Sequence, residues 1–325
     1  MKNEKYKYDD NNTSWIEKYR ITKIDDIIGQ DHIIQLMKNI IINRDMPNLL
    51  LWGNPGVGKT STSLSLCYEL YGFKKFEQNV LELNASDERG ISIVRNSIIN
   101  FTKLTVTTNK NINFKIIILD EAESMTKDAQ SALRKVMESY SNITRFIFIC
   151  NNIHNIIEPI QSRCMKLKFN EIPHDNIKEK ITEISISENL KLTKSGLKAI
   201  IELSNGDMRK CILLLQNLKY LDVKLNKKNI YNNYKYITFK KVNNYINKIK
   251  STDDVLTISS KLNNKGYLFL SIINQYVKFV INMNKEDNVK SKILFELTDV
   301  ENKIMCGCNE EILLWKLLNN IRINL

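Results

Sequence analysis

A glycine-rich segment between a short apolar run and a helical pattern constrains this chain more than any other feature. Such a segment lets backbone N–H groups converge on phosphate oxygens, and the helix that follows adds a favourable dipole. Its residues fit the pattern GxxxxGK[ST] in full: Gly53, Asn54, Pro55, Gly56, Val57, Gly58, Lys59 and Thr60. We expect Lys59 to reach the β- and γ-phosphates of ATP and the Thr60 hydroxyl to ligate Mg²⁺. The chain has only ten glycines, so three of them at these positions are hard to ascribe to chance.

Five short, nearly continuous apolar runs predict strands that are buried on both faces of a parallel sheet. They cover residues 48–52, 79–84, 115–119, 145–150 and 165–169. Helical patterns alternate with them at 59–71, 91–101 and 129–140. This alternation predicts an α/β fold over residues 15–170, a P-loop parallel sheet with helices on both faces.

The strand pattern stops after Pro173, and helical patterns take its place. Residues 175–189, 193–204 and 207–220 read as three helices, with Thr193 and either Asn205 or Asp207 as N-caps. We therefore expect a small helical lid domain over 171–222 and an all-α collar domain over 223–325, after a tail of residues 1–14. Amphipathic stretches at 268–281 and 312–323 support the all-α reading.

A pair of acids ends the apolar run at residues 116–119. Asp120 is expected to hold Mg²⁺, and Glu121 to orient and deprotonate the attacking water. Acids also end strands as helix caps, but a complete phosphate loop in the same chain favours catalysis. Together the two motifs predict an ATPase with ATP and Mg²⁺ as cofactors.

Net charge constrains the function less than these two motifs do. The net charge of +12 favours a polyanionic partner, although a generally lysine-rich composition explains it about as well. Nine lysines lie between residues 219 and 250, which we expect to be a solvated helix face, with DNA or partner contact as the less favoured alternative.

Cysteine content and apolar runs exclude other classes of protein. Six cysteines without a CxxC pair make a zinc site or a disulfide framework improbable. No apolar run is long enough to span a membrane, and the N-terminus does not resemble a secretory signal, so we expect an intracellular protein without a membrane partner.

Over residues 15–216 the sequence resembles the AAA+ clamp-loader small subunits of replication factor C. The segment 15–20 (WIEKYR) is similar to the WVEKYR box of this family, and 81–91 is similar to its LELNASDERGI segment. Residues 129–134 resemble its AQxALR helix, 162–164 its SRC motif and 206–210 its GDxRK motif. Within the family, residues 86–95 (SDERGISIVR) and 101–106 look most like the eukaryotic subunit numbered two in yeast and four in animals.

The resemblance implies roles for further residues. Asn151 matches the sensor 1 residue, which bonds the γ-phosphate or the water, and Arg209 matches sensor 2, a lid arginine that reads the γ-phosphate. Arg163 matches the arginine finger, which enters the ATP site of a neighbouring subunit in trans and therefore implies an oligomer. Arg20 and the pair Ile27 and Ile28 would lie near the nucleotide, although core packing explains the isoleucines almost as well.

Arg89 and Arg95 match positions that contact DNA phosphates in the family, although a single arginine is more often an ordinary surface group. The chain departs from the family at Ile21, which replaces a proline, and at Asn54 and Val57 in the loop. It also departs at Glu123, which replaces the last acid of DEAD and should be tolerated. No motif match extends beyond Leu218, so the collar rests on position and helicity.

The implied function is that of an ATP-hydrolysing subunit that opens a sliding clamp and loads it onto primer–template DNA in replication and repair. The implied partners are the other subunits of a heteropentamer, the clamp and the DNA, and the implied location is the nucleus. Two alternatives stay open: another AAA+ ring motor of the helicase or branch-migration type, and a nucleotide-binding scaffold that never hydrolyses.

Overall fold

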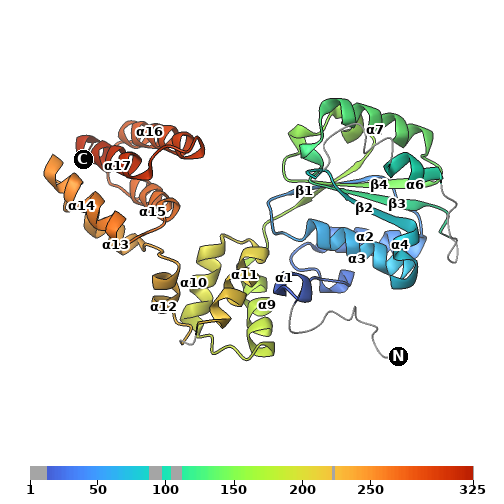
Figure 1. The fold of residues 1–325 in the computed structure, drawn as a ribbon, viewed down its shortest axis with the longest axis horizontal. Coiled ribbons are helices and arrows are strands. Elements are labelled where there is room, and N and C mark those ends of the chain that lie inside the picture. The colour runs from blue at the N-terminus through green and yellow to red at the C-terminus, as the bar shows by residue number, and fades with distance from the viewer. Residues whose placement is uncertain (1–12, 88–96, 104–111, 222–223, 325) are drawn as a thin grey trace. The chain divides into compact units, whose positions relative to one another are not determined.

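The computed structural model describes residues 13–87, 97–103, 112–221 and 224–324 (Figure 1). The chain divides into two compact units. One comprises Met1–Leu192 with Ile200–Asp222, and the other comprises Thr193–Ala199 with Val223–Leu325. The division into domains 15–170, 171–222 and 223–325 is a finer one and stays a prediction.

A five-stranded parallel sheet forms the centre of the first unit (Figure 1). Its order is β2-β3-β4-β1-β5, so the strand that enters the glycine-rich loop, β1, lies between β4 and β5. In the register, Leu50 lies opposite Phe148 and Leu51 opposite Leu167. All five predicted strands are confirmed to within one residue, as β1 (Leu49–Gly53), β2 (Val80–Asn84), β3 (Lys115–Asp120), β4 (Thr144–Cys150) and β5 (Met165–Phe169).

Helices cover both faces of this sheet, and alternate residues of each strand explain why (Figure 1). Leu49 and Leu51 point into a core shared with α2 (Asp31–Asn43) and α3 (Lys59–Tyr71). The residue between them, Leu50, joins the opposite core, which α7 (Lys127–Ser139) covers. The predicted α/β fold class is therefore confirmed. The smaller elements on the two faces are η1 (Ile24–Asp26), α4 (Phe73–Asn79), α6 (Ile99–Lys103), η3 (Ala122–Ser124), η4 (Ile153–Asn155) and α8 (Glu158–Gln161).

Helices follow the sheet in the chain, as predicted: α9 (His174–Ser187), α10 (Lys194–Ser204) and α11 (Met208–Lys219). The Asp207 side chain caps α11 by accepting a hydrogen bond from the Lys210 N–H. The Thr193 hydroxyl caps α10 in the same way, accepting from the Gly196 N–H at 3.1 Å. Both predicted caps are present. The helix predicted over 91–101 is only partly comparable, because residues 91–96 lie outside the described residues and α6 begins at Ile99.

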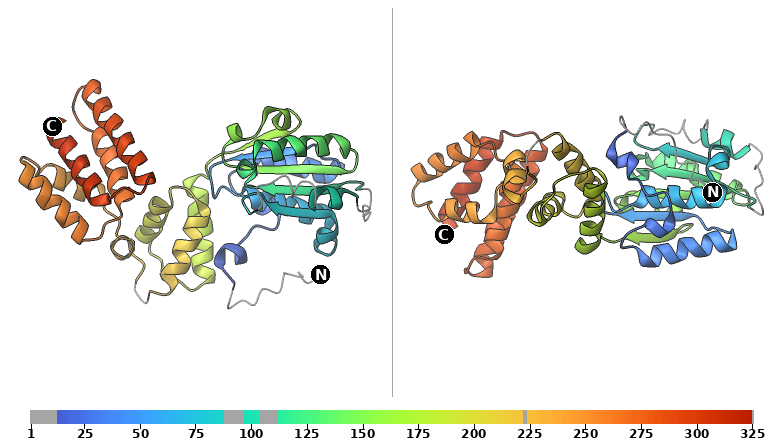
Figure 2. Two further views of the ribbon diagram at one scale, coloured as in Figure 1. Left: turned by 45° about the horizontal axis from the view of Figure 1, so that its top comes forward. Right: turned by 90° about the horizontal axis from the view of Figure 1, so that it is seen from below.

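Every element assigned in the described part of residues 223–325 is a helix, as Figure 2 shows from two directions. An apolar core, which includes Tyr276, Ile293 and Leu317, holds together the helices between residues 239 and 324. The predicted stretches 268–281 and 312–323 correspond to two of them, α15 and α17. The six are α12 (Lys227–Asn233), α13 (Phe239–Ile246), α14 (Thr252–Asn264), α15 (Phe269–Ile281), α16 (Asp287–Met305) and α17 (Glu310–Asn324).

Two further expectations concern the lysine run and the cysteines. Lys219 is exposed, as expected for the lysine face, but its ammonium also pairs with Glu188 at 2.8 Å and lies over the Trp15 ring. All six cysteines are free thiols, and burial raises the pKa of Cys150 and of Cys164 to about 12. Across the residues that the structure describes, none of the helices has the length and apolarity needed to cross a membrane.

Candidate active site

The glycine-rich loop joins the end of β1 to the start of α3, where the sequence placed it. Gly56 and Gly58 adopt φ angles of 73° and 98°, a region that favours glycine. Lys59 is 7% exposed, and its ammonium donates to the backbone oxygens of Gly53 at 2.7 Å and Asn54 at 2.8 Å. Burial lowers the pKa of Lys59, and the charge of Asp120 opposes that effect. The glycine-rich loop thus holds the Lys59 ammonium against its own backbone carbonyls.

The two predicted magnesium ligands are in direct contact. The Thr60 hydroxyl donates to Asp120 Oδ2 at 2.7 Å, and Asp120 Oδ1 accepts from the Glu121 N–H at 2.9 Å. This contact brings the start of α3 to the carboxyl end of β3. A hydroxyl and a carboxylate are the kind of oxygen ligands that Mg²⁺ takes when phosphates complete its shell. The residues present therefore fit a magnesium–triphosphate group.

Glu121 has an unusual backbone. Its φ of 52° and ψ of 39° place a non-glycine residue in the left-handed region, directly after the strand. Its side chain is exposed rather than packed into the core. Strain of this kind concentrates at functional sites, because the surrounding structure must hold it in place. Glu121 thus lies exposed, directly after the carboxyl end of β3.

Asn151 lies at the end of β4 and bridges two charged groups. Its Oδ1 accepts from the Lys59 ammonium at 2.9 Å. Its Nδ2 and its backbone N–H both donate to Glu123 Oε1, each at 2.9 Å. The sequence predicts that Glu123 is a tolerated departure from the family, and the structure adds that it accepts both hydrogen bonds that orient Asn151.

The C-terminal helices of the first unit reach the same site. Arg209, in the first turn of α11, places its Nη2 3.4 Å from the Thr60 hydroxyl. The Met208 N–H donates to the Gly56 carbonyl at 3.3 Å. A Cβ added at Gly56 would lie only 1.8 Å from Asp207 Oδ1, so the absence of a side chain at this glycine permits the approach. The predicted sensor arginine is thus adjacent to the loop.

A pocket opens beside these residues. Gly56, Val57 and Gly58 line one wall of it, and the α11 residues Met208, Arg209 and Ile212 line another. The remaining wall is largely apolar and includes both predicted isoleucines. It includes Ile16, Tyr19, Arg20, Ile21, Ile27, Ile28 and Ile172, and the polar residues Ser61, Thr62 and Lys180 complete the lining. An apolar wall next to a phosphate-binding loop is suited to a nucleoside base.

The remaining predicted residues lie elsewhere. The Arg163 side chain is 38% exposed and pairs with Glu138 at 2.5 Å, while its Nη1 donates to the Pro159 carbonyl at 2.9 Å. It does not line the pocket of its own chain. Arg89 and Arg95 fall outside the described residues.

Sequence reasoning missed two contacts at this site. Glu123 belongs to the same run of acids as Asp120, so its position next to the site was foreseeable, although its partner was not. Asp207 was recognised as a helix cap, but its approach to Gly56 involves residues 151 positions apart, and no local pattern signals it.

Two family models match the chain. Residues 49–172 match the model described as "ATPase family associated with various cellular activities (AAA)". Residues 237–319, in the region where we found no motif, match the "Replication factor C C-terminal domain".

The chain is also similar to named proteins over nearly its whole length. It is 38% identical to replication factor C subunit 2 of Saccharomyces cerevisiae, over 94% of this chain and 92% of that protein. It is 37% identical to replication factor C subunit 4 of Homo sapiens, over 92% and 85% respectively. The replication factor C small subunit of the archaeon Picrophilus torridus is 38% identical, over 94% and 96%.

Among solved structures, the chain resembles Thermotoga maritima RuvB, a Holliday junction branch migration motor. The match has a TM-score of 0.53 and 15% identity, and covers 75% of this chain and 85% of that one. At this identity the likeness concerns the fold alone.

Proposed function

This chain belongs to the replication factor C small subunits of the AAA ATPase family, and on that premise we propose that it binds and hydrolyses ATP within its clamp loader. One observation carries the proposal. The Thr60–Asp120 contact and the Lys59–Asn151 contact bring the glycine-rich loop and the ends of β3 and β4 into a single site. A scaffold that only stores nucleotide has no need of the exposed acid, Glu121, that follows them.

We assign the residues as follows. Lys59 and the loop residues 53–58 bind the triphosphate, while Thr60 and Asp120 hold magnesium, which would neutralise phosphate charge when bound. Glu121 orients the attacking water and takes its proton. Asn151 and Arg209 each place a donor toward the γ-phosphate, and Arg20 lies along the pocket wall.

Arg163 acts in trans in this proposal. It is exposed and lies outside the pocket of its own chain, as expected for a finger that completes the site of a neighbouring subunit. The other subunits of a heteropentamer are therefore its partners. ATP binding would order this ring around a sliding clamp and open it.

Primer–template DNA is the proposed trigger for hydrolysis and release. Arg89 and Arg95 are the proposed phosphate contacts, and the excess of basic residues is consistent with a polyanionic partner. The nucleus is the proposed location, on the likeness to the eukaryotic subunits. The three-domain division into ATPase (15–170), lid (171–222) and collar (223–325) belongs to the same proposal.

The test is ATP turnover by the assembled complex with substitutions in this subunit alone. Lys59→Ala should abolish ATP binding at this site, and Glu121→Gln should retain binding but lose hydrolysis. If neither variant changes turnover, the scaffold alternative holds. The branch-migration alternative has only the fold in its favour, and stimulation of turnover by the clamp together with primed DNA would exclude it.

A further inference from the structure

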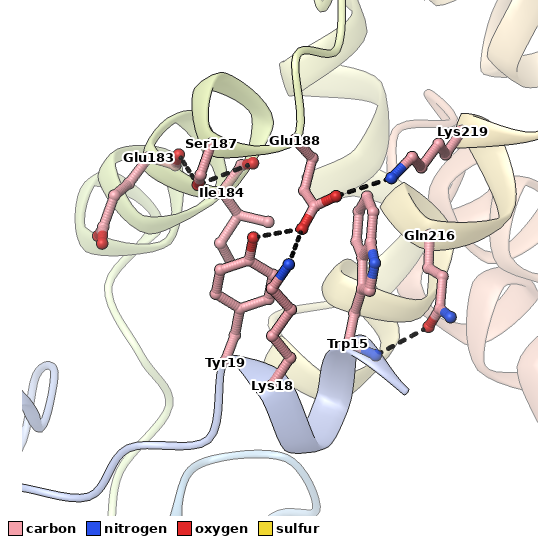
Figure 3. Close-up of polar contacts among 9 residues, drawn as sticks. All are labelled: Trp15, Lys18, Tyr19, Glu183, Ile184, Ser187, Glu188, Gln216 and Lys219. Carbon is pink, nitrogen blue, oxygen red and sulfur yellow. Dashed lines mark hydrogen bonds and ion pairs between the residues drawn. The ribbon is translucent and has the colours of Figure 1, made fainter. Parts of the chain in front are cut away.

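Glu188, which directly follows α9, receives three donors from two other parts of the first unit (Figure 3). Its Oε1 accepts from the Tyr19 hydroxyl at 2.6 Å and from the Lys18 ammonium at 2.8 Å. Its Oε2 accepts from the Lys219 ammonium, in the last turn of α11, at 2.8 Å. Only 6% of the Glu188 side chain is exposed. One carboxylate therefore joins the N-terminal segment to both α9 and α11.

An acid is unfavourable at this position unless it is paired. The C-terminal end of a helix carries partial negative charge, and burial of a carboxylate costs free energy. Burial by itself would raise the pKa of Glu188, but hydrogen bonds from Lys18, Lys219 and Tyr19 bring it down to about 2. The carboxylate is therefore ionised across the whole physiological range. Its three donors offset the cost of its position.

A second set of contacts fastens the same segment. The backbone N–H of Trp15 donates to Gln216 Oε1 at 3.2 Å, and the Trp15 ring lies under the Lys219 ammonium at 5.2 Å (Figure 3). Trp15 is 6% exposed. The short helix α1 (Trp15–Lys18) is thus held against α11 as well as against the end of α9.

The segment then runs directly into the nucleotide pocket. Tyr19 binds Glu188 and also lines the pocket, together with Arg20 and Ile21. Residues of α11, Met208 and Arg209 among them, line the same pocket from another side. The apolar wall and the α11 wall are therefore connected through Glu188 without passing through the sheet.

We infer that Glu188 is a positioning residue that fastens residues 15–20 to α9 and α11. The apolar wall of the pocket, which would face the base and is called the base-side wall below, then moves together with these two lid helices. The inference rests on the proposed function, because it takes the pocket to be that of ATP. It assigns Glu188 no contact with the nucleotide. Its effect is on the fraction of molecules in which the base-side wall is in place.

The test compares Glu188→Gln with the wild-type full chain by calorimetric titration of two probes, MgATP and inorganic tripolyphosphate. We expect Glu188→Gln to leave the base-side wall in place in about one molecule in ten, which lowers the apparent affinity for MgATP about tenfold. Tripolyphosphate has no base, so its affinity should change less than about twofold. Asp175→Asn, which breaks an exposed ion pair to Lys178 on the same helix, is the control and should leave both affinities unchanged.

Hydrogen exchange of residues 15–20 gives a second readout that does not depend on nucleotide. Glu188→Gln and Lys219→Met should both raise exchange in this segment, and Asp175→Asn should not. Unchanged exchange and an unchanged MgATP affinity in Glu188→Gln would overturn the inference while leaving the proposed function intact. An equal loss of affinity for both probes would also overturn it, since the whole lid would then be displaced. Failure of the wild-type chain to bind MgATP would overturn the proposed function and the inference with it.

Discussion

Glu123 accepts both the backbone N–H and the side-chain Nδ2 of Asn151 on one oxygen, each at 2.9 Å. Because Lys59 donates to Asn151 Oδ1, the two ends of the amide cannot be interchanged. An amide nitrogen carries two hydrogens, and Glu123 uses one of them. The second hydrogen remains available for a phosphate oxygen or a water.

The Glu123–Asn151 contact predicts a kinetic effect. Glu123→Ala removes the acceptor that orients Asn151, and a hydrogen bond to a charged group contributes about 1.5–3 kcal/mol. Since 1.4 kcal/mol corresponds to a factor of ten, we expect hydrolysis at this subunit's site in the assembled complex to fall about 10- to 100-fold, with ATP affinity changing less than about threefold. Single-turnover hydrolysis and ATP titration measure the two quantities separately.

Glu123→Gln is the matched control, because it keeps an acceptor oxygen at the same distance from the backbone. Its rate of hydrolysis at this site should lie between those of the wild type and Glu123→Ala. If Glu123→Ala hydrolyses ATP at the wild-type rate, Glu123 has no part in orienting Asn151, and its replacement of the family's aspartate is neutral, as the sequence alone suggested.

The close approach of Asp207 to Gly56 predicts that the loop tolerates no side chain there. An alanine at this position would place its Cβ 1.8 Å from Asp207 Oδ1, so α11 must shift and take Arg209 with it. We expect Gly56→Ala to weaken MgATP binding about tenfold or more, since both the loop and a lid contact are displaced. Calorimetric titration of the full chain measures this.

Gly206→Ala separates the clash from the backbone strain. Gly206 also has a positive φ, 82°, but a Cβ there would meet nothing within 4 Å. Gly206→Ala should lose about 1 kcal/mol of stability in urea unfolding, because alanine disfavours this φ region, and Gly56→Ala should lose more, because the clash with Asp207 adds to the same strain. Only Gly56→Ala should lose nucleotide affinity beyond about twofold. Equal binding losses in the two variants would show that strain, rather than the contact with Asp207, is the cause.

The sequence predicted those parts of the site that follow from local chemistry. Strands buried on both faces are continuous apolar runs, so residues 115–119 could be recognised without a structure. The contact between Thr60 and Asp120 was also predictable, because the carboxyl ends of parallel strands and the loop after β1 share one edge of the sheet.

Long-range side-chain partners could not be predicted in this way. Lys18 and Glu188 are 170 residues apart, and neither belongs to a pattern that names the other. Lys219 was predicted only as one member of a solvated lysine run, and nothing in that run identifies Glu188 and the Trp15 ring as its contacts. Such partners depend on how complete elements pack, and composition or periodicity carries no record of that.

The position of Arg163 predicts a loss of ATP hydrolysis that appears only in the assembled complex. Because this side chain is exposed and lies outside its own pocket, Arg163→Ala should bind MgATP with wild-type affinity in the isolated chain. In the complex, hydrolysis at the neighbouring site should fall by about 10³-fold or more, as is typical of a missing arginine finger. The measurement is ATP turnover by complexes in which every other site carries a substituted loop lysine.

Arg134→Ala is the control for this effect, because Arg134 shares the partner Glu138 without being the proposed finger. Its complex should hydrolyse ATP at close to the wild-type rate. Turnover at the neighbouring site that is insensitive to Arg163→Ala would remove the trans assignment.

The paired Glu188 carboxylate predicts how stability depends on pH. Its pKa is about 2 in the folded chain, compared with 4.5 for an unperturbed glutamate, so the folded state favours the ionised form. The contribution is therefore complete above about pH 5 and is lost as pH falls from there towards 2. Lys18 and Lys219 are partly exposed, so solvent screening reduces the contribution to about 1–2 kcal/mol. Urea unfolding at pH 7 should show Glu188→Gln less stable than the wild type by this amount, and the difference should shrink as the pH approaches 3.

Asp175→Asn is the control, because its carboxylate is exposed, and it should show little difference from the wild type at pH 7. If the stability deficit of Glu188→Gln persists unchanged at pH 3, lost packing rather than lost charge destabilises the variant.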